Sequence, residues 1–143
     1  MKITNIYILL FIVIDFFCKN LIIKKIKLYK CYHICSYLNF IYLKNYGIIF
    51  GFLKNYKNTV LVFNVINIII IIFFFIKNKN KQLTNNFILG GILGNFISRI
   101  KYGFVIDFID IHIYNYHFPV FNIADILICI GIIFIIKDIF LNI

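Results

Sequence analysis

Hydrophobic residues along the chain collect into four long runs, separated by segments rich in lysine, asparagine and aromatic residues. The runs cover residues 3–18, 60–76, 83–100 and 120–136, and a lysine closes the first, second and fourth. The third run is the weakest, because glycines and an asparagine interrupt it. A helix that crosses a bilayer needs about 20 mostly apolar residues. The pattern therefore predicts four transmembrane helices in one domain of residues 1–143, with both termini on the same side.

The first run has a second interpretation as a cleaved signal peptide. Lys2 gives it a basic start, and an apolar stretch follows. However, no small-x-small cleavage site is present, and Asp15 occupies the position where one would be needed. We therefore favour a retained span and keep the cleaved leader as the alternative.

The segments between the runs predict structure at the membrane surface. Residues 21–37 alternate lysines with leucine, isoleucine and tyrosine, which is typical of an amphipathic helix lying among lipid headgroups. Residues 38–52 and 100–117 are rich in β-branched and aromatic side chains and contain glycines, which favours short strands with turns. Both segments lie on one side of the membrane, so they could pair. The expected fold class is a membrane all-α protein: a four-transmembrane-helix bundle with a small β-sheet and an interfacial amphipathic helix.

Composition strengthens the membrane interpretation. Hydrophobic residues make up 63% of the chain and charged residues only 14%, whereas soluble domains are about 45–50% apolar and about 25% charged. The formal net charge of +10 indicates contact with anionic lipid headgroups. The lysines flank apolar runs and form no stripe of their own, so no nucleic-acid partner is expected. Basic residues lie on both sides of the second run, so the positive-inside rule leaves the orientation open.

Cysteine and histidine spacing gives little support for a metal site. Cys31 and Cys35 flank His33, and the three residues together faintly resemble a metal-binding cluster. However, zinc sites usually have four ligands at recognisable spacing. His112 and His117 lie on an aromatic segment without matching spacing. We therefore expect no metal and interpret these histidines as interfacial.

Polar side chains within or beside apolar runs are the candidates for chemistry, because they are costly to place in lipid. They are Asp15, Asn95, Arg99, Asp107, Asn122 and Asp125. Asp15 and Lys19 are four residues apart with the acid first, the order that favours an ion pair on a helix.

Asp107 and Asp125 form the most informative pair. They lie on separate predicted elements and could converge at one membrane surface. Two close carboxylates cannot both ionise easily, so one keeps a proton, and such a pair can activate water against an amide. The alternative is that each aspartate only caps a helix or pairs with a lysine.

The sequence around these acids resembles the lipoprotein signal peptidases, also called type II signal peptidases. Five segments match blocks of that family in order, and they are residues 15–19, 45–51, 90–99, 103–108 and 118–125. The last two segments are the most specific and contain Asp107 and Asp125. The sequence departs from the family pattern at Ser98, where the family usually has aspartate, and at Phe16, where it often has glutamine.

The resemblance implies a membrane aspartic endopeptidase. It would remove the signal peptide from diacylglyceryl-modified prolipoproteins, cutting just before the lipidated cysteine. Asp107 and Asp125 would be the catalytic acids, without a metal, a cofactor or a covalent intermediate. The residues implied to bind or orient the substrate are Asn45, Gly47, Asn95, Arg99 and Asn122. Asp15 and Lys19 are expected to form a structural ion pair.

The resemblance also implies a location. The protein would be a monomer that spans the bacterial cytoplasmic (inner) membrane several times, with both termini in the cytoplasm. The sheet and the active site would lie at the extracytoplasmic face, and the partners would be prolipoproteins and membrane lipids. The alternative from another class is a small non-catalytic membrane scaffold or a degenerate, inactive homologue.

Overall fold

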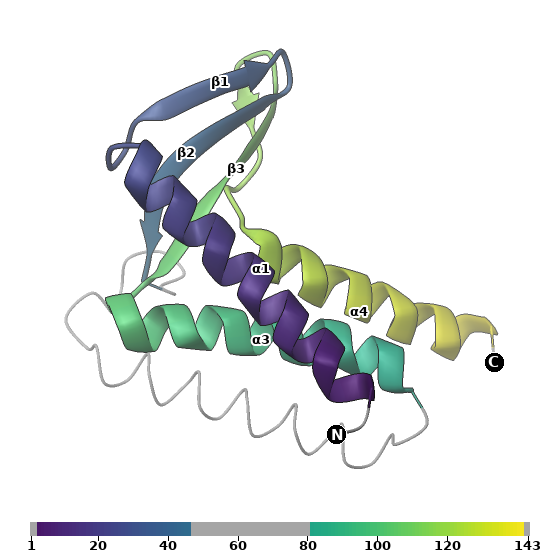
Figure 1. Ribbon diagram of the computed structural model, residues 1–143. Helices are drawn as coiled ribbons and strands as arrows, with labels where there is room; N and C mark the ends of the chain where they lie inside the picture. Colours follow the sequence, from purple (N-terminus) through teal and green to yellow (C-terminus); the bar gives the residue numbers. More distant parts are fainter. Residues whose placement is uncertain (1–2, 47–80, 142–143) are drawn as a thin grey trace.

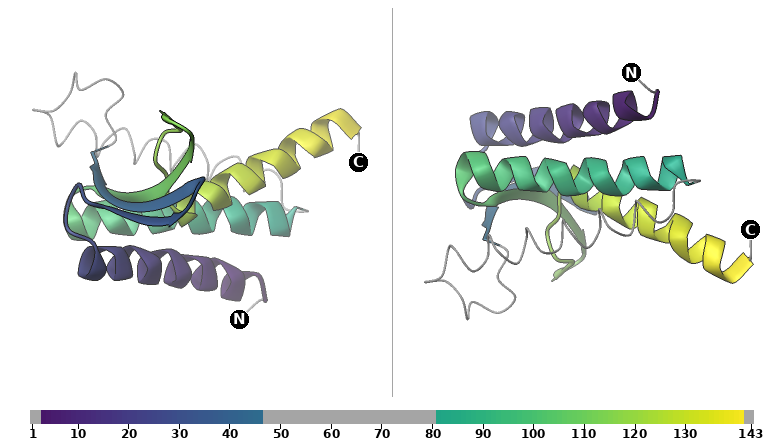
Figure 2. Two further views of the ribbon diagram at one scale, coloured as in Figure 1. Left: turned by 90° about the horizontal axis from the view of Figure 1, so that it is seen from above. Right: turned by 90° about the horizontal axis from the view of Figure 1, so that it is seen from below.

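The computed structural model describes residues 3–46 and 81–141, which form three helices and four strands. In chain order the elements are α1 (Ile3–Lys25), β1 (Cys31–Cys35), β2 (Leu38–Asn45), α3 (Gln82–Tyr102), β3 (Val105–Ile113), β4 (Tyr116–His117) and α4 (Ile123–Leu141). The helices lie side by side, with α3 between α1 and α4 (Figure 1, Figure 2). The sheet lies at the end of this layer where α1 and α3 finish and α4 begins (Figure 1).

The helices carry many exposed apolar side chains. Those on α1 and α4 include Leu9, Val13, Phe17, Ile133 and Phe140. Such extended apolar surface marks contact with a membrane or another protein. Among the described residues, one helical segment is long and apolar enough by itself to cross a bilayer, Ile6–Lys25.

Three of the four predicted apolar runs can be compared with the observed helices. Run 3–18 is helical and continues further to Lys25, and run 83–100 falls within α3. Run 120–136 becomes helical only from Ile123, the first residue of α4. Run 60–76 lies outside the described residues, so the count of four spans stays a prediction.

The sheet has the strand order β1-β2-β3-β4, and each neighbouring pair is antiparallel. The prediction that the two β-branched segments pair is confirmed for β2 and β3, where Leu38 lies opposite Ile111 and Asn45 lies opposite Val105. The first six residues of β3 are buried. This strand is therefore enclosed on both faces, and it carries Asp107.

The predicted amphipathic helix over residues 21–37 is wrong. Residues 21–25 complete α1, and Cys31–Cys35 form β1. No helix breaker separates residues 21–25 from the first apolar run, and Ile22 is buried against the sheet, so the helix continues. The chain then turns at Tyr29, whose φ is positive, and β1 takes its hydrogen bonds from β2.

A small hydrophobic core joins α1 to the sheet. It consists of Ile22, Tyr42, Ile106, Phe108 and Ile109. Burying each large apolar side chain contributes about 1.5–3 kcal/mol. The core therefore fixes the sheet on the helices at the point where β3 enters the bundle.

Two glycines let the three helices approach one another closely. A Cβ on Gly91 would overlap the carbonyl oxygen of Ala124 in α4, and a Cβ on Gly94 would lie 2.8 Å from the carboxylate of Asp15 in α1. Small residues at helix interfaces allow such close packing in membranes. The glycines of α3 thus serve helix packing, and they bring α1 and α4 to the same short stretch of α3.

Candidate active site

Asp107 is held by two asparagine side chains. It is 4% exposed, and its Oδ2 accepts a hydrogen bond of 2.8 Å from Asn45 Nδ2 in β2. Its Oδ1 accepts one of 2.7 Å from Asn122 Nδ2. Burial raises the pKa of Asp107 and the charge of Asp125 raises it further, while the hydrogen bonds from Asn122 and Asn45 lower it; the net shift is upward. The carboxyl group is thus oriented by its neighbours and retains a proton more readily than an exposed aspartate.

Asp125 is held in the first turn of α4 by a reciprocal pair of hydrogen bonds. Asn122 lies just before the helix, and its Oδ1 accepts a hydrogen bond of 3.1 Å from the backbone N–H of Asp125. In return, Asp125 Oδ2 accepts a hydrogen bond of 3.1 Å from the backbone N–H of Asn122. This is the geometry of a capping box, which satisfies two backbone donors at a helix start. The other carboxylate oxygen of Asp125, Oδ1, accepts 2.8 Å from Asn95 Nδ2 in α3.

Asn122 therefore connects the two acids. Its amide oxygen belongs to the cap that orients Asp125, and its amide nitrogen donates to Asp107. The helix-capping role considered for Asp125 is present, and in the same arrangement the two carboxyl groups share one side-chain neighbour. Asn122 thus fixes the position of Asp125 relative to Asp107.

A buried ion pair lies behind Asp125. Lys19 Nζ donates to Asp15 Oδ2 at 2.7 Å and to Asn95 Oδ1 at 2.8 Å, and both charged side chains are at most 1% exposed. Asp15 Oδ1 also accepts a hydrogen bond of 3.0 Å from the backbone N–H of Ala124 in α4. Asp15 and Lys19 thus link α1 to α3 and α4, and through Asn95 they orient Asp125.

Ser98, where the sequence departs from the family pattern, and its neighbour Arg99 lie near the end of α3. Ser98 is buried, and its hydroxyl donates a hydrogen bond of 3.3 Å to the carbonyl oxygen of Phe104. This bond closes the turn after α3. The Nε of Arg99 is buried and has no hydrogen-bond partner among the described residues. The charges of Asp125 and Asp107 both act on the Arg99 side chain. Gly47, the remaining predicted substrate residue, lies outside the described residues.

Comparison with known proteins identifies the family of this chain. A family model described as signal peptidase (SPase) II matches residues 7–141, nearly the whole chain. The chain belongs to the signal peptidase II family.

Individual relatives agree with the family match. A lipoprotein signal peptidase of Wigglesworthia glossinidia brevipalpis is 42% identical to this chain, over 94% of this chain and 92% of that protein. One from Haemophilus influenzae (strain Rd) is 37% identical, over 90% of this chain and 80% of that protein. A bacterial membrane enzyme solved by the in meso method at 1.9 Å has a TM-score of 0.83 and 32% identity, over 95% of this chain and 91% of that chain. This member of the signal peptidase II family is therefore a bacterial membrane protein of a protease family.

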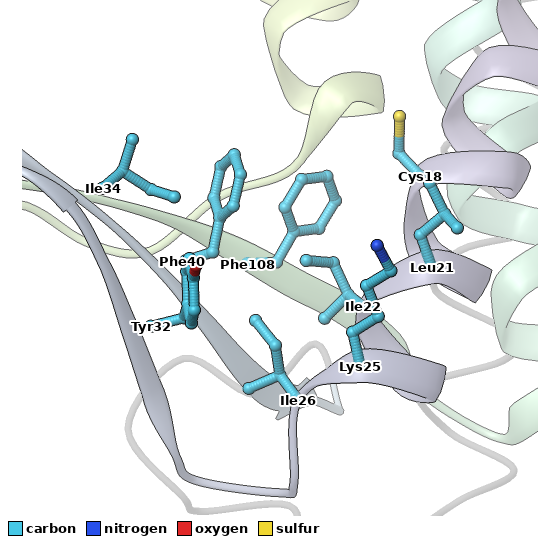
Figure 3. Close-up of a pocket in the computed structure, with 9 residues that line it drawn as sticks. All are labelled: Cys18, Leu21, Ile22, Lys25, Ile26, Tyr32, Ile34, Phe40 and Phe108. Atoms are coloured by element: carbon cyan, nitrogen blue, oxygen red, sulfur yellow. The ribbon is translucent and has the colours of Figure 1, made fainter.

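An apolar pocket lies beside the strand that carries Asp107. It measures about 590 Å³ and is enclosed by the C-terminal half of α1 and by the sheet (Figure 3). Ile22, Phe40 and Phe108 are among its lining residues, and Lys25 is the one charged residue in the lining. Phe108 follows Asp107 directly, so β3 contributes both to the pocket and to the candidate site. In the described part of this signal peptidase II chain, no group of three or more His, Cys, Asp or Glu residues could hold a metal ion.

Proposed function

We propose that this chain is a membrane aspartic endopeptidase that removes the signal peptide from diacylglyceryl-modified prolipoproteins, cutting just before the lipidated cysteine. The single observation that carries the proposal is the side chain of Asn122, which bonds to Asp107 and caps the helix turn that holds Asp125. The family match supplies the substrate class.

The two acids act as one proton-transfer unit. At neutral pH they share a proton because the ionised form of one disfavours ionisation of the other. The ionised carboxylate takes a proton from a water molecule, whose oxygen attacks the scissile carbonyl carbon. The protonated acid donates to the carbonyl oxygen, and the resulting tetrahedral species expels the amine, which takes up a proton as it leaves. No covalent enzyme intermediate forms in this sequence.

The neighbouring polar residues divide into two groups. Asn45, Asn95 and Asn122 bond to the acids and hold their carboxyl planes. Arg99 has a buried donor that no described residue engages, and this donor serves the substrate backbone. Gly47 follows β2 by two positions and is proposed to contact the substrate as well.

The architecture proposed for this function has four spans, with both termini in the cytoplasm and a single chain as the active unit. The sheet and the start of α4 lie at the end of the bundle where α1 finishes (Figure 1), and these elements carry Asp107 and Asp125. We assign this end to the extracytoplasmic face of the inner membrane. Lys24 and Lys25 at this end of α1 suit contact with anionic headgroups. The pocket beneath the sheet accepts an acyl chain of the substrate, because its lining is almost entirely apolar.

The proposal is tested by cleavage of a synthetic diacylated prolipoprotein peptide by the purified full chain in detergent micelles. Asp107→Asn and Asp125→Asn should each lower kcat by about 10²–10⁴-fold, and the double variant should lose little more, because the two acids act as a unit. Asp138→Asn is the matched control, since Asp138 lies outside the site in a surface pair with Lys81.

Asp125→Asn also separates catalysis from helix capping. The asparagine keeps an oxygen for the backbone N–H of Asn122, so the cap survives while the acid is lost. Full activity in this variant would mean that Asp125 serves only the helix, which favours the non-catalytic scaffold. A peptide with an unmodified cysteine should be a poor substrate, and equal rates with and without the lipid would contradict the proposed specificity.

A further inference from the structure

A second polar network crosses the whole sheet. Asp110 in β3 is 4% exposed. Its Oδ2 accepts a hydrogen bond of 2.9 Å from Asn39 Nδ2 in β2. Its Oδ1 lies 2.7 Å from His117 Nδ1 in β4. Asn39 Oδ1 in turn lies 3.1 Å from His33 Nδ1 in β1. The rings of His112 and His117 stack at 4.9 Å. One side-chain network thus ties all four strands together, and it includes all three histidines of the chain.

The network keeps Asp110 as a carboxylate. Burial alone would raise the pKa of Asp110, but the hydrogen bonds from Asn39 and His117 outweigh it, and the net shift is downward. This is opposite to the shift at Asp107, three residues earlier on the same strand. The surroundings of the two aspartates of β3 therefore act on their pKa in opposite directions.

The strand pair β2–β3 carries two asparagine–aspartate links, Asn39 with Asp110 and Asn45 with Asp107. The two asparagines are six residues apart, which in a regular strand would place them on one face of β2. The two aspartates are three residues apart, which in a regular strand would place them on opposite faces. Without an irregularity, both links could not form at once.

A shift in register resolves this conflict. Phe40 lies opposite Ile109, and Leu43 lies opposite Asp107. The two β2 residues are three positions apart and their β3 partners only two, so β2 contains one extra residue between them. At the same place the backbone N–H groups of both Phe108 and Ile109 donate to the carbonyl of Phe121. A bulge of this kind re-aims the side chains that follow it. Here the extra residue lies on β2, so Asn39 reaches Asp110 on one face of β3 while Asn45 reaches Asp107 on the other.

We infer that Asp110 is a positioning residue for the proposed peptidase: its links to Asn39 and His117 pin β3 on the outer side of the bulge and so hold Asp107 against Asn45 and Asn122. The inference rests on the proposed function of Asp107. A one-residue slip of a strand turns every side chain to the other face. The Asn39–Asp110 link is a specific side-chain contact that opposes such a slip on the outer side of the bulge.

The experiment compares Asp110→Ala and Asn39→Ala with a swapped pair, Asn39→Asp combined with Asp110→Asn. The swap exchanges the two groups and preserves a hydrogen bond between carboxylate and amide, and Asp138→Asn controls for the lost charge. Cleavage of the diacylated peptide gives kcat and KM for the folded fraction. Hydrogen–deuterium exchange measures protection of the backbone amides around Asp107 and does not depend on activity.

Each alanine variant should lower kcat by up to about 10²-fold, because small misplacements of a reacting group cost that much. KM should change little, since the acyl pocket is untouched. Amides around Asp107 should exchange faster, and the swapped pair should restore both kcat and protection. If Asp110→Ala fails to fold, Asn39→Ala is judged by the same criteria.

The inference is overturned if the alanine variants keep the wild-type kcat and protection, or if the swapped pair restores neither. Failure of the wild-type chain to cleave the peptide would instead reject the proposed function. In that case the exchange measurement alone still decides whether Asp110 holds β3 in register.

Discussion

Replacing Lys19 with methionine tests the buried network that joins α1 to the catalytic helix. Methionine has a similar length and no charge, so the substitution removes the ammonium group and leaves little empty space. It deletes the hydrogen bonds of 2.7 Å to Asp15 and 2.8 Å to Asn95. Asp15, which is fully buried, then keeps one partner, the backbone N–H of Ala124.

The size of the effect follows from burial. Breaking a buried ion pair by removing one partner costs about 3–5 kcal/mol, because a charge is left uncompensated. Since Asp15 retains the bond from Ala124, we place Lys19→Met near the lower end, at about 3 kcal/mol of unfolding free energy. The matched control is Lys81→Met, which breaks the partly exposed pair between Lys81 and Asp138 and should cost less than about 1 kcal/mol.

The assay is equilibrium unfolding in mixed detergent micelles, combined with peptide cleavage. The double variant Asp15→Asn with Lys19→Met should recover most of the lost stability, because the uncompensated charge is gone and the introduced amide oxygen can still accept from the backbone N–H of Ala124. Cleavage should remain impaired in both variants, since Asn95 has lost the donor that holds its amide toward Asp125.

Two results would refute this reasoning. The first is a cost for Lys19→Met no larger than that for Lys81→Met. The second is a double variant whose destabilisation equals the sum of its two single substitutions, because a coupled pair cannot behave additively.

Three further predictions test other parts of the molecule. Gly91→Ala should lower the unfolding free energy by about 1–3 kcal/mol, measured in the same micelles, because its methyl group overlaps the carbonyl of Ala124; wild-type stability would show that α3 can move away without cost. Ser98→Ala should cost about 1 kcal/mol through the lost bond to Phe104 and leave kcat nearly unchanged, whereas a large fall in kcat would place Ser98 in the chemistry. Ile34→Asp, at the open side of the pocket, should raise KM for the diacylated peptide with little change in kcat, and an unchanged KM would remove the pocket from the substrate path.

Three of the helical runs could be predicted from their continuous apolar sequence. The pairing of β2 with β3 could be predicted because both segments are rich in β-branched and aromatic residues and were placed on one side of the membrane. The helix over residues 21–37 was mispredicted because lysines alternate with apolar residues in both an interfacial helix and an exposed edge strand. All five residues of β1 are exposed, so its pattern carried no signal of a buried face. Its partner strand determines its structure, and periodicity within a single segment does not reveal a partner.

The two acids could be proposed from the sequence, while the arrangement around them could not. The position of Asn122 depends on the carbonyl of Phe121, which accepts hydrogen bonds from two residues of β3. The link between Asn39 and Asp110 joins residues 71 positions apart. Neither contact leaves a spacing pattern in the chain, so sequence reasoning could not find Asn39 or assign a role to Asp110.

The capping box at the start of α4 has a consequence for how the site meets its reaction. The hydrogen bonds that orient Asp125 also hold the first helical turn, so the carboxylate cannot rotate without fraying α4. The polar groups are therefore already aligned before the peptide arrives, and little reorganisation of dipoles is required as charge develops on the scissile carbonyl. The proposed reaction would therefore use alignment that folding has already produced.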